Sequence, residues 1–340
     1  MDNWILKGAK MLANEPASQN ITSPTQVKVK VSHLLMTNFD ALVYSGDVKV
    51  SYPRIPGRVA VGIVTEVGDN SYGLKKGMRV YFEPARPCGQ CLPCKSGKPK
   101  ECREVMLAGK DFDGFMRDFV VCEYNEVTHL PDGVKNFEAL CIETVGIAEN
   151  IYDRLNLTPG QKVAVIGGNF TGNLIAQILM FHKITPIVID NLTANIERAK
   201  KCGIYFTFAA DDELEDNIKS ATGGALCDAV IYCSGSRLPL SLISRIIAEN
   251  KTAVFAVLGA TSSNLDIRDV LEKNLTVFGV SSAYGYTDSV INLLLHDAVN
   301  LDVFEKVVLT DYNPAALLEE RLSPTPSAQK GKMTILKMII

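Results

Sequence analysis

The sequence predicts an α/β protein in which an irregular β-rich domain is joined to a doubly wound parallel sheet. Between residues 27 and 67, short β-branched runs alternate with Gly and Pro, and helical periodicity is scarce. After about residue 155, apolar runs of strand length alternate with segments of helix length, a pattern typical of βαβ units around a parallel sheet. A chain of 340 residues that is 47% hydrophobic is long enough to bury two cores.

The individual elements follow from these two patterns. Val27–Val31 and Gly57–Val67 are the expected strands of the first domain. In the second domain we expect six strands, at Lys162–Gly167, Pro186–Asp190, Ile204–Phe208, Asp228–Ser234, Thr252–Gly259 and Leu275–Val280. The clearest helix is Thr193–Cys202, which Asn191 or Thr193 can cap and Gly203 can end. We also expect a helix at Asp288–Leu295, an exposed loop over residues 323–332, and a strand at Met333–Ile340 that returns to the first domain.

Charge and hydropathy narrow the classes of function. The formal net charge is -3 and no Lys/Arg stripe is present, which argues against a nucleic-acid partner or an anionic membrane surface. No run of about 18 apolar residues occurs, and the first residues lack the basic and apolar regions of a signal peptide. We therefore expect a cytoplasmic protein that acts on small molecules.

Four of the nine cysteines fall in one Pro-, Gly- and Lys-rich loop. They form the pattern Cys88-x2-Cys91-x2-Cys94-x7-Cys102. Four thiolates can close a tetrahedral shell around Zn²⁺ with no open position, so such an ion would stabilise the loop and perform no chemistry. The pattern predicts one structural zinc per chain, and the alternatives are four free thiols or an iron–sulfur cluster.

A glycine-containing turn follows the first strand of the second domain. It reads Gly167-x-Asn169-x-x-Gly172, with Phe170 and Thr171 opening the next helix. The N–H groups and dipole at such a helix start bind the pyrophosphate of a dinucleotide. The side chain of Asn169 stands where the usual motif has glycine, so it can crowd the phosphates and weaken or displace binding. One alternative is therefore a domain of this type that no longer binds a nucleotide.

Asp190 ends the second strand of this domain, 18 residues after Gly172. An acid at this place bonds the ribose hydroxyls of NAD. Its charge would repel a 2′-phosphate, so NAD(H) is favoured over NADP(H).

Together these motifs resemble the zinc-type medium-chain alcohol and polyol dehydrogenase family over essentially the whole chain. Its structural-zinc lobe carries the same cysteine spacing, and its fourth strand ends beside the cofactor at the position of Ser234, within residues 230–235. Leu258–Gly259 and Gly279–Ser281 match strands that flank the nicotinamide. The resemblance implies a GroES-like catalytic domain at 1–148 and 285–340, with the zinc lobe at 86–103, and a Rossmann domain at 149–284. It also implies an alcohol or polyol substrate and a homodimer or homotetramer.

The chain departs from this family at the catalytic zinc. The family's Cys-Gly-Ser-Asp-x-His-x-Tyr-x-Gly segment matches residues 37–46, where the zinc-binding Cys is Thr37 and Asp40 is retained. The two groups that relay the substrate proton are replaced by Phe39 and Leu42. In the family's Gly-His-Glu motif, Arg58 replaces the second zinc ligand.

Only Glu143 matches the third ligand, as in sorbitol-type members. A hydroxyl, a guanidinium and a carboxylate cannot form an ordinary catalytic zinc shell, so we predict that no catalytic zinc is bound.

Two functions are compatible with these losses. The protein can be a dehydrogenase that polarises the carbonyl with fixed side chains in place of a Lewis acid. Arg58 is then the best candidate, because it can pair with Glu143 or bind an anionic group such as the phosphate of a polyol phosphate. Thr37, Tyr44 and Tyr52 offer hydroxyls. Alternatively, Arg58 and Glu143 merely fill the former metal cavity, and the chain is a catalytically silent nucleotide-binding or regulatory protein.

Overall fold

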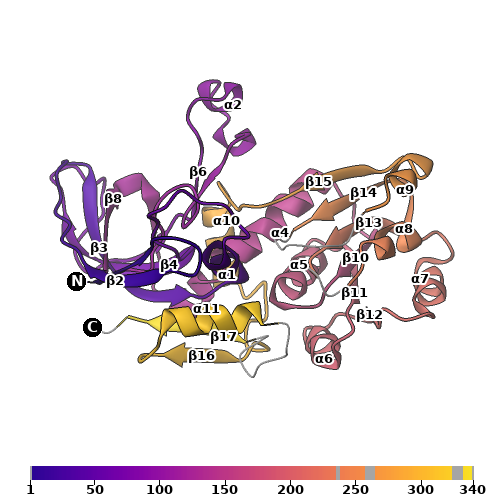
Figure 1. Ribbon diagram of the computed structural model, residues 1–340. Coiled ribbons are helices and arrows are strands. Elements are labelled where there is room, and N and C mark those ends of the chain that lie inside the picture. Colours follow the sequence, from indigo (N-terminus) through magenta and orange to yellow (C-terminus); the bar gives the residue numbers. More distant parts are fainter. Residues whose placement is uncertain (1, 235–237, 257–264, 324–331, 339–340) are drawn as a thin grey trace. The chain divides into compact units, whose positions relative to one another are not determined.

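The computed structural model describes residues 2–234, 238–256, 265–323 and 332–338. The chain divides into two compact units, one of residues 1–143 and 305–340 and the other of residues 144–304 (Figure 1). From the sequence, residues 285–304 were assigned to the first domain, yet here they belong to the second unit. The reason is local packing, because Asn300 donates to the side chain of Gln177 and the ring of Phe304 meets that of Phe170 edge-on.

The first unit is rich in strands. Its strands are β1 (Asp2–Leu6), β2 (Leu12–Pro16), β3 (Gln26–Leu35), β4 (Val59–Val67), β5 (Arg79–Phe82), β6 (Ala85–Arg86), β7 (Met106–Leu107), β8 (Phe119–Glu123), β9 (Val127–His129), β16 (Lys306–Leu309) and β17 (Met333–Lys337). Its short helices are α1 (Asn38–Ser45), α2 (Leu92–Lys95), η1 (Pro99–Glu101), η2 (Tyr124–Glu126), α3 (Asn136–Ala139) and α11 (Pro314–Leu322). The strand expected at residues 27–31 is confirmed as part of β3, and the one expected at 57–67 is confirmed as β4, which begins two residues later, at Val59.

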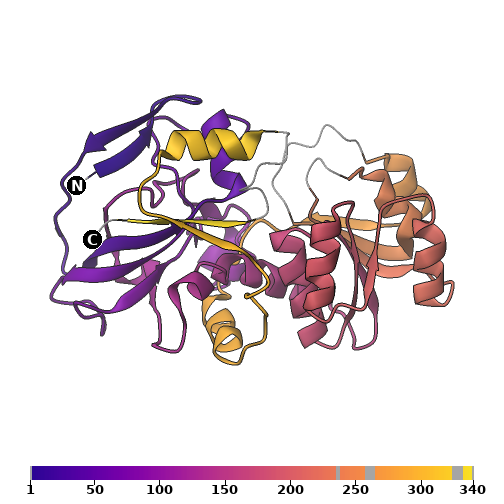
Figure 2. The same ribbon diagram turned by 90° about the horizontal axis from the view of Figure 1, so that it is seen from below.

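One sheet organises this unit. Its strands run in the order β16-β17-β3-β4-β5-β9, and β8 also pairs with β3. The late strand β17 lies antiparallel to β3, with Ile335 opposite Leu35, so the predicted return of the chain is confirmed. Figure 2 shows these yellow C-terminal strands beside the indigo N-terminal ones.

The second unit is a doubly wound sheet, as predicted. The helix α4 (Ile142–Leu155) leads into it from the first unit. Its strands are β10 (Lys162–Ile166), β11 (Thr185–Ile189), β12 (Phe206–Phe208), β13 (Cys227–Tyr232), β14 (Ile247–Phe255) and β15 (Thr276–Gly279). Its further helices are α5 (Phe170–Phe181), α6 (Thr193–Lys201), α7 (Leu214–Thr222), α8 (Ser241–Ile246), α9 (Ile267–Glu272) and α10 (Thr287–Leu295).

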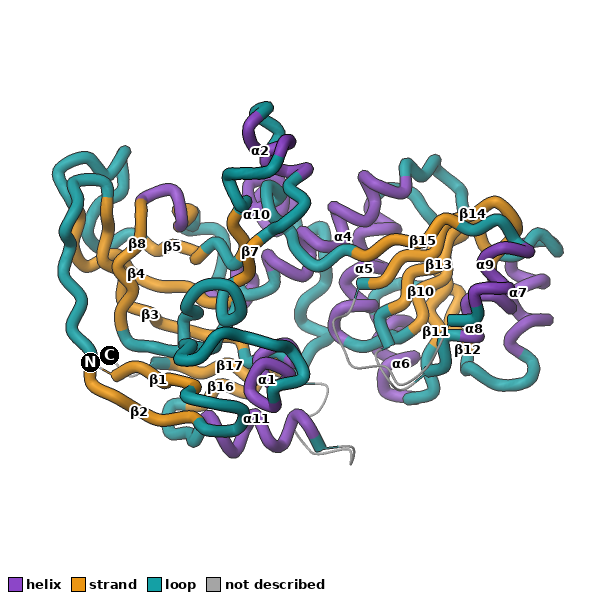
Figure 3. Tube along the Cα trace, turned by 45° about the horizontal axis from the view of Figure 1, so that its top comes forward, coloured by secondary structure: helices purple, strands orange, loops and turns teal. Residues whose placement is uncertain are grey.

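All six strands are parallel, in the order β12-β11-β10-β13-β14-β15 (Figure 3). Alternate residues of β10 face opposite sides of the sheet, and Ala164 and Ile166 lie in a core with Ile218 of α7 and Ile243 of α8. Burying each such aliphatic side chain contributes about 1.5–3 kcal/mol. The sheet therefore holds the carboxyl ends of β10, β11 and β13 at one edge.

The predicted cap of one helix is wrong. The helix α6 begins where expected, but its N-cap is Leu192, which provides no side-chain cap. The carboxylate of Asp190 instead accepts from the N–H of Leu192 at 2.8 Å, while Asn191 accepts from the N–H of Ala210. Gly203 follows the helix with a positive φ of 82°, as expected for its end.

Some predictions lie outside the described residues. These are Gly235, the end of the fifth strand with Leu258 and Gly259, most of the loop at 323–332, and the last two residues of the C-terminal strand. In the described ranges, no helix has the length and apolar character needed to cross a lipid bilayer.

Candidate functional site

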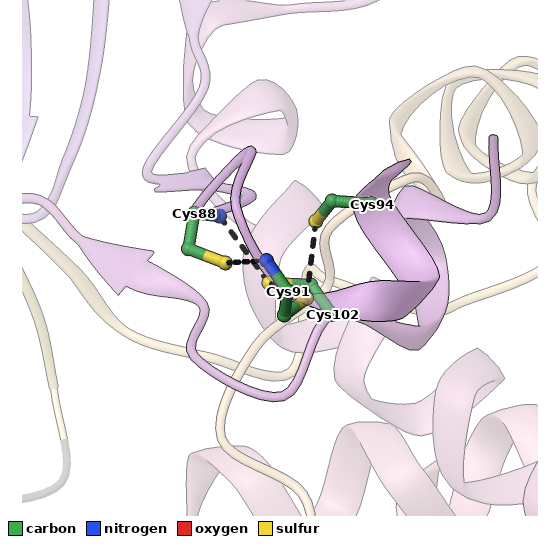
Figure 4. A group of neighbouring side chains, drawn as sticks. All are labelled: Cys88, Cys91, Cys94 and Cys102. Atoms are coloured by element: carbon green, nitrogen blue, oxygen red, sulfur yellow. Dashed lines mark hydrogen bonds between the residues drawn. The ribbon is translucent and has the colours of Figure 1, made fainter. Parts of the chain in front are cut away.

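The four cysteines of the loop come together in the structure (Figure 4). Their Sγ atoms all lie within 4.8 Å of one another. The Sγ of Cys91 is 3.4 Å from that of Cys94 and 3.9 Å from that of Cys102. Four thiolates bound to one zinc ion at about 2.3 Å would lie about 3.8 Å apart, so the spacing fits a single tetrahedral ion. It is far from the S–S bond length of about 2.05 Å.

The surroundings of this cluster also suit a metal. The N–H of Cys88 donates to the Sγ of Cys102 at 3.2 Å, and that of Cys91 donates to the Sγ of Cys88 at 3.4 Å, contacts that stabilise thiolates. Neither α2 nor η1 contains a buried residue, so this lobe has no hydrophobic core of its own. An iron–sulfur cluster would distribute the thiolates over several irons and separate them further. The donor set is therefore consistent with a structural zinc.

Arg58 and Glu143 form a buried ion pair in the first unit. Their side chains are only 7% and 6% exposed, and Nη2 of Arg58 donates to Oε1 of Glu143. The guanidinium also lies over the ring of Phe39, 4.8 Å from its centroid. Glu143 is in the first turn of α4. The pairing expected from the sequence is thus present, with an aromatic face that the sequence did not indicate.

Asp40 fixes the backbone beside this ion pair. Its Oδ2 accepts from the N–H and the hydroxyl of Thr37, at 2.8 and 2.6 Å, in a capping box at the start of α1. Its Oδ1 accepts from the N–H groups of Gly57 and Arg58, at 3.2 and 3.0 Å. Burial raises the pKa of Asp40, while bonds from Thr37 and the charges of Arg321 and Arg58 oppose the rise. Thr37 and Asp40 therefore position Arg58.

Gly57 lets the chain make this turn. Its φ is +96°, and a Cβ there would lie 2.7 Å from a methyl of Leu34 and 2.8 Å from the backbone nitrogen of Met116. The carbonyl of Gly57 also accepts from the N–H of Phe115 at 2.8 Å. Because only glycine fits, the direction in which Arg58 leaves the chain is fixed.

Sequence reasoning missed Tyr81. This residue is fully buried in β5, and its hydroxyl has no hydrogen-bond partner among the described residues. Burial raises the pKa of Tyr81 well above its usual range, and the nearby charges of Glu143 and Glu83 raise it further. From the sequence, a tyrosine within an apolar strand is predicted to be an ordinary core residue. Only the nearby ion pair of Arg58 and Glu143 indicates that its hydroxyl belongs to the site.

We expect the change Asp40→Asn to destabilise the first unit by about 1–3 kcal/mol, because an amide cannot accept all four hydrogen bonds and leaves buried donors unpaired. Chemical denaturation measures the loss. Asp47→Asn is the control, because Asp47 is exposed and accepts from Ser45 nearby. Equal stability of the two variants would contradict the positioning role of Asp40.

In the second unit, the turn between β10 and α5 requires two of its glycines. Gly167 has a φ of +105°, and a Cβ there would lie 2.8 Å from backbone atoms of Ser234. A Cβ on Gly172 would meet the carbonyl oxygen of Gly167 at 1.8 Å. Phe170 and Thr171 form the first turn of α5, with Asn169 as its N-cap. The predicted strand–turn–helix geometry of a dinucleotide site is therefore present.

Asp190 and Ser234 lie at the strand ends beside this turn. Asp190 is 3% exposed, and its carboxylate accepts from the N–H of Gly168 at 2.8 Å and from the amide of Asn195 at 2.9 Å. The carboxylate of Asp190 thus makes hydrogen bonds within the protein that the sequence did not indicate. Ser234 is buried, and its hydroxyl has no hydrogen-bond partner among the described residues.

Two family models match the chain. Residues 23–132 match the alcohol dehydrogenase GroES-like domain, and residues 170–295 match the zinc-binding dehydrogenase domain. Among solved structures, a short chain alcohol dehydrogenase from Escherichia coli CFT073, in complex with NADH, is similar with a TM-score of 0.84. That likeness covers 99% of each chain at 22% identity, so it supports the fold.

Curated relatives extend the comparison. A sorbitol dehydrogenase of Halalkalibacterium halodurans is 26% identical over 263 residues, 76% of each chain. A probable D-xylulose reductase A of Aspergillus fumigatus is 30% identical over 250 residues, which are 72% of this chain and 70% of the relative. With this identity over more than two thirds of both sequences, and with the fold and cysteine cluster described above, the chain belongs to the zinc-type medium-chain alcohol and polyol dehydrogenase family.

Proposed function

We propose that the chain is an NAD(P)-dependent oxidoreductase that transfers hydride to or from an alcohol or polyol carbon without a catalytic zinc. The buried ion pair of Arg58 and Glu143 carries this proposal. A guanidinium repels a dication, and the hydroxyl of Thr37 is already bonded to Asp40. These groups replace the nitrogen and thiolate donors that a catalytic zinc requires.

The proposed chemistry depends on a fixed positive charge. A bound nicotinamide cofactor would supply or accept the hydride. Arg58, held by Glu143 and Phe39, would stabilise negative charge on the substrate oxygen as the carbonyl is reduced or the alcohol oxidised. Because Asp40 and Gly57 fix the backbone at this point, the guanidinium is preorganised.

The names of the two curated relatives support a polyol or its ketose as substrate. A phosphorylated polyol is a second candidate substrate, since a guanidinium can bind a phosphate group through two parallel hydrogen bonds. Asp190, at the end of β11, favours NAD(H) over NADP(H) because its charge would oppose a 2′-phosphate. The cytoplasmic location and the homodimer or homotetramer stay predictions.

One observation favours the alternative, a catalytically silent protein that binds nucleotide or regulates a partner. Thr37, Asp40, Arg58 and Glu143 bond to one another or to neighbouring backbone, as residues that only fill a former metal site would do.

Zinc analysis, NADH titration and turnover together distinguish these functions. We expect about one zinc per chain, saturable NADH fluorescence, and NADH oxidation with at least one member of a panel of ketoses. Two zincs per chain would contradict the zinc-free site. NADH binding without turnover across the panel would support the silent protein, and no binding at millimolar NADH would remove the dehydrogenase function.

A further inference from the structure

The side chain of Asn169 occupies the start of α5. Its Oδ1 accepts from the N–H of Gly172 at 3.1 Å, and its Nδ2 donates to the carbonyl of Cys233 at 2.7 Å. The φ of Asn169 is -65°, a value that any residue adopts. The turn therefore requires glycine at 167 and 172 but not at 169.

The hydrogen bond between Gly172 and Asn169 affects how an anion can bind at the start of α5. The first N–H groups of a helix have no partner within the helix, and this makes a helix start a site for phosphate. Gly172 is the third residue of α5, the position whose N–H a capping side chain usually bonds. In this chain, the N–H of Gly172 already donates to the carboxamide oxygen of Asn169.

Asp190, which lies beside the turn, also accepts hydrogen bonds from the protein itself. The two oxygens of Asp190 accept from the N–H of Gly168, the N–H of Leu192 and the amide of Asn195. Asn195 in turn accepts from Arg198 at 2.8 Å. The N–H groups of Gly168 and Gly172 in the turn therefore bond to side chains of the protein itself. The buried hydroxyl of Ser234, in contrast, has no hydrogen-bond partner among the described residues.

We propose that Asn169 is an internal competitor for the pyrophosphate of the cofactor and sets a low affinity for dinucleotides. The proposal rests on the proposed function, since it concerns the same cofactor site. A pyrophosphate that approaches the start of α5 would compete with the carboxamide oxygen for the N–H of Gly172, and the bond to Cys233 holds the carboxamide in place. The competition acts on the phosphates and not on the adenosine end of the ligand.

The test is calorimetric binding of ADP-ribose, NADH and adenosine to the full chain. For Asn169→Gly we expect the Kd of ADP-ribose and of NADH to fall about three- to tenfold, the range that one hydrogen bond contributes. The Kd of adenosine should not change. Glycine replaces an asparagine cap at little cost, so the variant should fold.

Asn313→Gly is the matched control. Asn313 is also an asparagine N-cap, of α11 in the other unit, and accepts from the N–H groups of Ala315 and Ala316. It should leave all three Kd values unchanged. Asn169→Ala, which also lacks the carboxamide but adds no backbone freedom, is a second variant.

Three results would overturn the proposal. An unchanged or higher Kd for ADP-ribose in the Asn169 variants would show that the side chain does not compete, or that it binds the cofactor itself. An equal gain for adenosine would place the effect away from the phosphates. If neither the natural chain nor the variants bind any dinucleotide, the proposed function fails as well, whereas binding by the natural chain alone leaves that function intact.

Discussion

The change Cys88→Ser is expected to abolish zinc binding and to unfold the lobe at residues 86–103. Three thiolates cannot close the tetrahedral shell, and the lobe has no buried residue in α2 or η1 to hold it together. Structural zinc contributes about 10–16 kcal/mol to the folding of isolated zinc-finger peptides near neutral pH. Loss of a large part of this free energy should open the lobe while the two sheets persist.

Zinc analysis by mass spectrometry and limited proteolysis measure this effect. The zinc content should fall from about one to near zero per chain, and new cleavage sites should appear in the lobe. Cys202→Ser is the control, because Cys202 lies at the end of α6 in the second unit and does not belong to the cluster. Full zinc content and an uncleaved lobe in the Cys88 variant would contradict a closed zinc site.

The change Arg58→Met is expected to lower the free energy of unfolding by about 3–5 kcal/mol, because it leaves the carboxylate of Glu143 buried without its partner. The double variant with Glu143→Leu removes both charges and should recover most of this loss, since apolar groups often replace a buried ion pair without cost. Chemical denaturation of the two single variants and the double variant gives the coupling energy.

The exposed pair of Lys200 and Glu197 is the control for this cycle, because Lys200→Met should cost less than about 1 kcal/mol. A double variant whose loss of stability equals the sum of the two single losses would show that the two charges are not coupled. The same double variant also tests function. If it folds but binds NADH without turnover, the charges serve the chemistry, whereas unchanged turnover would remove Arg58 from it.

The architecture could be predicted because buried parallel strands leave long apolar runs in the sequence. All six strands of the second unit were found in this way, with ends displaced by up to five residues, as at β14, which begins at Ile247. The return of β17 to the first unit was also predictable, because a short apolar run near the end of the chain needs a sheet to bury it, whereas its partner β3 was not predicted.

The details of the site were less predictable, because one side chain can serve several backbone groups. Asp190 was assigned to the ribose, and for that reason its role at the start of α6 was overlooked. Thr37 and Asp40 were read as chemical groups, although a threonine three residues before an acid is also the pattern of a capping box. The hydroxyl of Tyr81 gave no signal, since the ion pair of Arg58 and Glu143 near it comes from other segments of the chain.

The placement of β17 has a consequence for synthesis on the ribosome. The edge of β3 at His33–Leu35 pairs with β17, whose residues follow the whole second unit in the chain. At about 5–20 residues per second, residues 144–304 take on the order of ten to thirty seconds to translate. During this interval the nascent first unit exposes an unpaired strand edge, the kind of surface that chaperones shield and that neighbouring nascent chains can join.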